Sequence, residues 1–123
     1  MKMLRNEKLQ ELKEKVYELI ARTSIEIGHR TDAKTMVALA QIFAKDLMIE
    51  KRFGKMTFNN IEEAFRIGVR FGKDEPFLNI RTFYKWSYAH KKKIDEAEYE
   101  VRTLGKDPKS VPYYNNQKLI GNE

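Results

Sequence analysis

The fold is decided by residues 56–93, which read MTFNNIEEAFRIGVRFGKDEPFLNIRTFYKWSYAHKKK. Thr57 and Asn79 each stand before an amphipathic run, where a side-chain oxygen can accept from the unpaired N–H groups of a first helical turn. A glycine-containing turn and a proline-containing apolar loop separate the two runs. The stretch therefore predicts two capped helices, at residues 58–71 and 80–104.

Each of these helices carries one informative local feature. Gly68 lies in the middle of the first helix, where glycine costs about 1 kcal/mol relative to alanine, so we expect it to permit close approach of a neighbouring helix. In the second helix, Phe83 and Tyr84 are expected to pack in the core. The sequence leaves open whether this helix runs unbroken across residues 90–93.

Two further helices are predicted upstream. Apolar residues recur at steps of three and four through residues 4–27, and Gly28 ends that run. The pair Thr31-Asp32 offers an N-cap for a helix at residues 33–52. That helix is apolar over so much of its circumference that we expect it to be central. Gly54 follows it and can take the left-handed conformation common just past a helix end.

The last segment, residues 105–123, contains two prolines and an Asn-Asn pair and predicts an irregular tail. Val111, Tyr113 and Tyr114 are expected to hold this tail against the core. No stretch has the pattern of a strand. The sequence thus predicts an all-α fold, a single-domain bundle of about four helices over residues 1–104. The third and fourth helices form a helix-turn-helix-like pair, although the loop between them is longer than the usual three or four residues.

Composition excludes several classes of protein. No apolar run approaches the roughly 18 residues that a membrane span needs, and the charged N-terminal segment has no signal-peptide core. The chain has no cysteine, which excludes disulfides and thiolate zinc sites. These features predict a cytoplasmic protein, located in the host cell if phage-encoded, with no membrane partner.

The sequence shows no catalytic or metal-binding constellation. His29 and His90 are the two histidines and are not at ligand spacing. Residues 68–74, GVRFGKD, differ from a phosphate-binding loop in glycine spacing and end in Asp where Ser or Thr would hold magnesium. The acids within residues 95–100 are expected to be solvated and paired with lysines. We therefore expect a non-enzymatic protein without metal or cofactor.

Charge is segregated along the chain, whose formal net charge is +6. Residues 79–93 contain five Lys and Arg side chains and no acid, whereas residues 94–104 contain one Arg and four acids. A localised anion-binding surface requires such segregation. The alternative is a solvated helix whose two halves differ in charge.

Basic and aromatic side chains of the last helix form the candidate nucleic-acid site. Lys and Arg would contact phosphates, the polar residues at the helix start lie where recognition helices reach base edges, and exposed aromatic rings would stack on unpaired bases. Of Trp86 and Tyr88, one is expected to be exposed. The candidate residues are Asn79, Arg81, Thr82, Lys85, Trp86, Tyr88, Lys91, Lys92 and Lys93.

Residues 56–89 also resemble the C-terminal part of the replication-P type helicase loaders of lambda-like phages. The shared outline is a Thr-capped helix with spaced apolar, small and Arg residues, followed by an aromatic-bearing loop and helix. It is carried here by Thr57, Ile61, Ala64, Arg66, Pro76-Phe77-Leu78, Phe83 and Trp86. The resemblance covers about a quarter of the chain and implies a replication accessory of a phage or mobile element.

The leading hypothesis is a DNA-binding or DNA-replication accessory protein that uses this basic aromatic helix. The alternative is a protein-interaction module, such as a helicase adaptor, a host-protein inhibitor or a virion component. In that case the amphipathic first helix would dock a partner or a second copy. The docking residues would be Leu9, Leu12, Val16 and Leu19.

Overall fold

The computed structural model describes residues 2–73 and 75–114, and these form a bundle of four α-helices. The helices are α1 (Leu9–Ile27), α2 (Ala33–Ile49), α3 (Phe58–Phe71) and α4 (Ile80–Arg102). Three short 3-10 helices accompany them, η1 (Leu4–Asn6), η2 (Lys51–Phe53) and η3 (Pro108–Ser110). The prediction of an all-α bundle of about four helices is confirmed. No helix of the described residues is long and apolar enough to cross a membrane.

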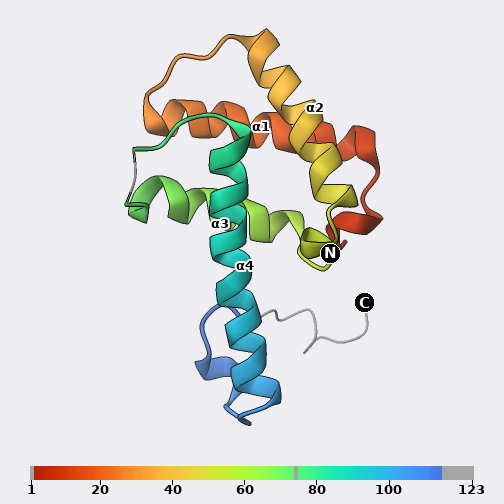
Figure 1. Cartoon of the computed structure of the whole chain (residues 1–123), viewed down its shortest axis with the longest axis vertical. Helices are drawn as coiled ribbons and strands as arrows, with labels where there is room; N and C mark the ends of the chain where they lie inside the picture. The colour runs from red at the N-terminus through yellow and green to blue at the C-terminus, as the bar shows by residue number, and fades with distance from the viewer. Residues whose placement is uncertain (1, 74, 115–123) are drawn as a thin grey trace.

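The helices pack in two pairs, α1 with α2 and α3 with α4 (Figure 1). α1 and α3 lie one above the other, and α4 crosses α3 at a steep angle. The first half of α4 contacts the other helices, while its second half extends beyond them. Because the other helices do not enclose α4, it has accessible surface on two sides.

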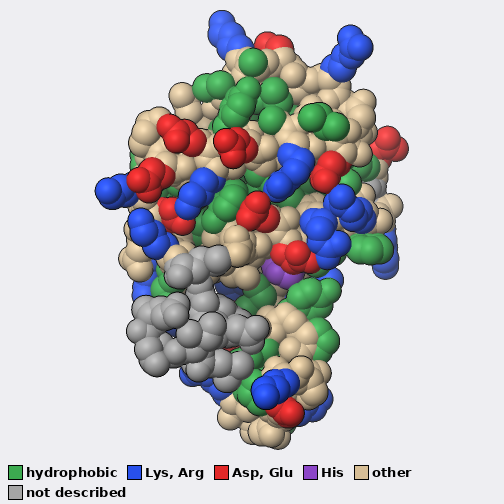
Figure 2. Space-filling model, turned by 180° about the vertical axis from the view of Figure 1, so that it is seen from behind, with side chains coloured by type: hydrophobic (Ala, Val, Ile, Leu, Met, Phe, Trp, Pro, Cys, Tyr) green, Lys and Arg blue, Asp and Glu red, His purple; other side chains and the backbone are tan. Residues whose placement is uncertain are grey.

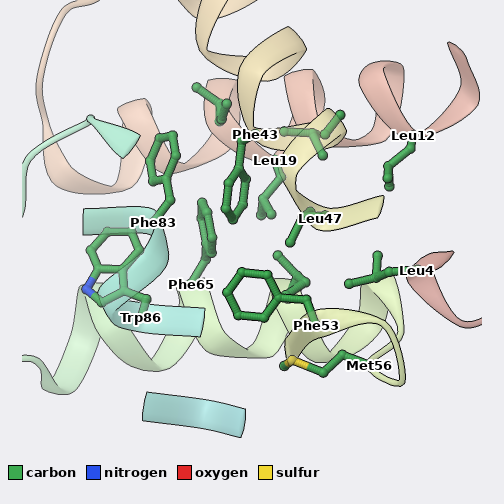
Figure 3. Packing of buried hydrophobic residues seen from close by; sticks show 14 of the residues in the cluster. Leu4, Leu12, Leu19, Phe43, Leu47, Phe53, Met56, Phe65, Phe83 and Trp86 are labelled. Atoms are coloured by element: carbon green, nitrogen blue, oxygen red, sulfur yellow. The ribbon is translucent and has the colours of Figure 1, made fainter. Parts of the chain in front are cut away.

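Three phenylalanine rings from three helices form the centre of the core (Figure 3). Phe43 of α2 lies 5.9 Å from Phe65 of α3 and 5.3 Å from Phe83 of α4, between ring centroids. The Phe65 and Phe83 rings are 5.0 Å apart, and all three are fully buried. Each helix repeats apolar residues at helical spacing, so the bundle can bury one stripe from each. The expectation that α2 is central is wrong, because α2 buries only one face, through Ala40, Phe43, Ala44 and Leu47. Its other apolar residues, Val37, Ile42 and Ile49, are exposed.

The stripe of α1 faces the same core, which corrects the docking hypothesis. Leu12, Val16 and Leu19 are buried inside the protein, and Leu9 packs against them partly buried. They are therefore occupied by the fold itself and do not form a surface for a partner. An isolated sequence shows that a stripe must be buried, but not against what.

The caps of α3 and α4 are as predicted. Thr57 Oγ1 accepts from the N–H of Asn60 at 3.2 Å, and Asn60 Oδ1 accepts from the N–H of Thr57 at 2.9 Å, a reciprocal capping box. Asn79 Oδ1 accepts from the N–H of Thr82 at 2.8 Å. The predicted side-chain cap of α2 is wrong. Asp32 occupies the N-cap position, but its side chain accepts no hydrogen bond from the first turn. The first turn of α2 is exposed, so water can satisfy its N–H groups.

The ends of the helices differ from prediction in four places, one of them at α4, which ends at Arg102 and not at residue 104. The segment predicted to begin α1 forms η1 instead, because the N–H of Leu4 donates to the carbonyl of Met56 at 2.7 Å and Leu4 is buried. α2 ends at Ile49, and η2 follows it. Gly54 has φ −57° and not the predicted left-handed conformation, because its N–H continues the right-handed turn by donating to Lys51.

The predicted end of α1 at Gly28 is confirmed, and Gly28 there takes the left-handed conformation, with φ 74°. α4 runs unbroken through residues 90–93, which answers the question that the sequence left open. After α4 the chain turns back through η3. Val111 is buried there, and the ring of Tyr113 lies edge-on to His90 at 5.4 Å. The part of the predicted tail at residues 115–123 lies outside the described residues.

Candidate functional site

An open groove of about 620 Å³ runs between the C-terminal half of α3 and the first half of α4. Its floor is set by Gly68 and Trp86, which meet where the two helices cross. A Cβ atom at Gly68 would lie 2.3 Å from Trp86 Cδ1, closer than real contacts allow. The predicted close approach at Gly68 is therefore confirmed, and the indole ring fills the space of the missing side chain.

The rim of the groove is basic. Its described lining contains four cationic side chains and one carboxylate, that of Glu75. Arg81 and Lys93 come from α4 and are separated by about three helical turns, while Lys73 comes from the loop after α3. All three are exposed. Lys85 is the fourth, and together these cations give the groove a positive edge along α4.

Two phenylalanines add exposed apolar surface to the groove. Phe71 at the end of α3 is 71% exposed and Phe77 in the following loop is 53% exposed. The ring of Phe77 lies 6.0 Å from that of His29, in the loop between α1 and α2. Rings of this size are usually buried, so two exposed at one groove indicate a binding surface.

The structure divides the predicted site residues between the two sides of α4. Successive residues are rotated by about 100° along a helix, so consecutive lysines cannot face one way. The groove between α3 and α4 is lined by Asn79, Arg81, Thr82, Lys85, Trp86 and Lys93. A second groove on the other side of α4 is lined in part by Tyr88, Lys91 and Lys92.

The predicted stacking role of Trp86 is corrected by its burial. Trp86 is 8% exposed and lies against Phe65, with centroids 5.2 Å apart, so neither face of the indole is open to a base. Tyr88 is half-buried between Phe53 and Arg52, and its hydroxyl oxygen accepts from Arg52 Nη1 at 3.1 Å. The exposed rings that line this groove are instead Phe71 and Phe77, which sequence reasoning missed as site residues. The sequence did contain a signal for their exposure, because Phe71 precedes Gly72 and Phe77 follows Pro76, and neither position is in the interior of a predicted helix.

His90 lies buried at the inner edge of the groove, 4% exposed. Its Nδ1 has no hydrogen-bond partner among the described residues. Burial lowers the pKa of His90, the carboxylate of Glu63 on α3 opposes that shift, and Lys93 adds to it. Tyr113 covers the ring from the segment after α4. The imidazole is therefore neutral at pH 7.

Acidification is expected to destabilise the fold through His90. Because burial holds the folded-state pKa below its ordinary value of 6.5, the unfolded chain takes up this proton first as the pH falls. The contribution to stability is complete above pH 6.5 and is lost as the pH falls toward the folded-state pKa. Urea unfolding of the wild type and of His90→Gln, at a series of pH values from above 6.5 downward, measures this loss of stability. The wild type should lose more stability on acidification, and identical losses would contradict the assignment to His90.

The face of the molecule behind α4 differs in charge from the basic groove. Seen from there, acidic and basic side chains alternate across the upper part of the molecule (Figure 2). Ion pairs join α1 to α3, with Arg22 Nη2 3.2 Å from Glu62 Oε2 and Arg70 Nη2 3.0 Å from Glu26 Oε2. Such exposed pairs contribute at most about 1 kcal/mol each. Their mixed signs make this face a poor surface for anions.

No group of three His, Asp or Glu side chains comes together as metal ligands within residues 2–73 and 75–114. Residues 68–71 of the glycine-containing stretch form the last turn of α3. Comparisons with models of known protein families, with curated proteins and with solved structures found no match.

Proposed function

We propose that this protein binds single-stranded DNA in the groove between α3 and α4, as an accessory of DNA replication in a phage or mobile element. The observation that carries the binding proposal is the pairing of a basic rim with two exposed phenylalanine rings in one groove. The replication setting is supported only by the resemblance of residues 56–89 to the phage helicase loaders.

The chemistry of the groove fits an unpaired strand. Arg81, Lys93 and Lys73 can each replace a counterion on a phosphate. Phe71 and Phe77 offer ring faces on which bases can stack, at about 1–3 kcal/mol for each base. A duplex keeps its base faces covered, so exposed rings favour the single-stranded form. Asn79 and Thr82 lie at the start of α4 and line the same groove, so their uncharged polar side chains would lie beside a bound strand.

Fluorescence anisotropy with a short labelled single-stranded oligonucleotide tests this proposal. Arg81→Ala/Lys93→Ala is expected to weaken binding by about tenfold or more. The same change should reduce the salt slope by about 0.7 for each phosphate that the protein no longer neutralises. Phe77→Ala should weaken binding with little change in that slope, because it removes a stacking surface and no charge.

The matched control is Lys34→Ala/Lys45→Ala, which removes the same charge from exposed positions on α2. This variant should bind within about twofold of the wild type, since the two lysines lie outside the groove. Equal weakening in both double variants would show that binding follows net charge and not the groove. A preference for the duplex would contradict the stacking role of the phenylalanines.

A further inference from the structure

Figure 1 shows that the second half of α4 extends beyond the other helices. The second groove lies along this part of α4, and its lining differs from that of the proposed DNA groove. It has a volume of about 720 Å³ and is mostly apolar. Its lining includes two exposed large hydrophobic residues, Tyr99 and Leu104, each 56% exposed. The far side of the same half-helix is covered, with Ile94 and Ala97 buried.

Charge is ordered along this groove. Its end near the helical body is basic, with Arg52 from η2 and the pair Lys91-Lys92. Its outer end is acidic, with Asp95, Glu96 and Glu100. The distance along α4 from Lys92 to Glu100 is about 12 Å at a rise of about 1.5 Å per residue. The groove is therefore a short apolar strip with opposite charges at its two ends.

We propose that this groove binds the same groove of a second copy of the chain, with the two α4 helices antiparallel. A twofold rotation places the basic end of each strip against the acidic end of the other, so the surface is complementary to itself. With Lys92 of one copy opposite Glu100 of the other, Leu104 of each copy lies opposite Tyr88 of the second, and the two Tyr99 side chains lie on either side of the twofold axis. A parallel arrangement would bring like charges together and is disfavoured.

The ion pairs already present do not prevent this pairing. Lys91 Nζ lies 2.5 Å from Asp95 Oδ2 and Lys106 Nζ lies 3.1 Å from Glu100 Oε1, both within the same chain. Water and salt weaken such surface pairs, so they can exchange for contacts with the second copy. The groove of the proposed DNA site lies on the other side of α4, and the dimer does not depend on that function.

Sedimentation velocity across micromolar to near-millimolar concentrations tests the proposal. The wild type is expected to shift from the mass of one chain, 14.6 kDa, to twice that mass, and the shift should weaken as salt is raised. Tyr99→Arg changes an exposed side chain, so it should fold normally and remain a monomer. A wild type that stays monomeric throughout, or a dimer that Tyr99→Arg leaves intact, would overturn the proposal.

Charge reversal identifies the antiparallel arrangement. Lys91→Glu/Lys92→Glu makes the groove acidic at both ends, and Glu96→Lys/Glu100→Lys makes it basic at both ends. Each variant alone should dimerise at least about tenfold more weakly, a difference of about 1.4 kcal/mol. A mixture of the two should form a heterodimer, because each supplies the charge that the other lacks.

Circular dichroism first establishes that both variants are helical. Lys34→Glu/Lys45→Glu on α2 makes the same change in net charge as the lysine reversal but lies outside the groove, and it should dimerise as the wild type does. Failure of the two folded groove variants to associate when mixed would overturn the antiparallel arrangement. Weakened association of the α2 control to the same extent would overturn the assignment to this groove, because the effect would then follow net charge.

Discussion

Gly68→Ala is expected to destabilise the protein by roughly 2 kcal/mol, although alanine is the better helix former. In an open helix this change gains about 1 kcal/mol. Here the new methyl group would lie 2.3–2.4 Å from three atoms of the Trp86 ring. The ring is rigid and buried against Phe65, and relieving such overpacking costs about 1–3 kcal/mol or more.

Urea unfolding gives the free-energy change, and fluorescence reports its cause. Trp86 is the only tryptophan, so its displacement toward water should shift the emission of the folded protein to longer wavelength. The matched control is Gly54→Ala, where φ is −57° and the nearest atom to a new Cβ is 3.5 Å away. This control should be neutral or stabilising. A stabilised Gly68→Ala with unchanged emission would show that α3 and α4 are not in contact at this position.

Phe43→Ala is expected to cost about 3–5 kcal/mol, the range found when a buried phenylalanine is truncated. Phe43 is fully buried and its ring contacts Phe65, Phe83 and Tyr84, at centroid distances of 5.9, 5.3 and 5.9 Å. The change therefore removes the α2 ring that contacts both α3 and α4 in the described core. Since small domains are stable by only about 5–15 kcal/mol, a large part of the total stability would disappear.

Chemical unfolding monitored by circular dichroism measures this effect. Ile42→Ala serves as the control, because Ile42 is the preceding residue on α2 and is half exposed. Its cost should stay within about 0.5 kcal/mol. Similar losses of stability in the two variants would mean that α2 does not present the Phe43 face to the core.

Local chemistry made most of the fold predictable. Thr57 and Asn79 cap their helices as the sequence indicates, because a cap is formed by residues close together in the chain. Gly28 ends α1 for an equally local reason. The start of α1 was not predictable in this way. Leu4 is drawn out of a regular helix by its hydrogen bond to Met56, and a contact between residues so distant in the chain leaves no local pattern.

The candidate site was predictable in charge but not in shape. The basic character of α4 is visible in the sequence, and Arg81 and Lys93 do lie at one groove. The division of the lysines between two grooves depends on which side of α4 meets α3, and that is fixed by Gly68 and Trp86 together. The same contact buries Trp86, so the exposed rings at this groove are Phe71 and Phe77. The match between a glycine-sized gap and an indole ring cannot be derived from either helix alone.

The projection of α4 gives the molecule a mechanical property. The helix is about 35 Å long at about 1.5 Å per residue, and only its first half is held by the other helices. If α4 tilts as a unit, it pivots where it crosses α3. A tilt of about 10° at that crossing would carry the free end by roughly 3 Å over the outer half of the helix. A small change in the crossing angle at Gly68 would therefore become a larger displacement at Tyr99 and Leu104, near the far end of α4.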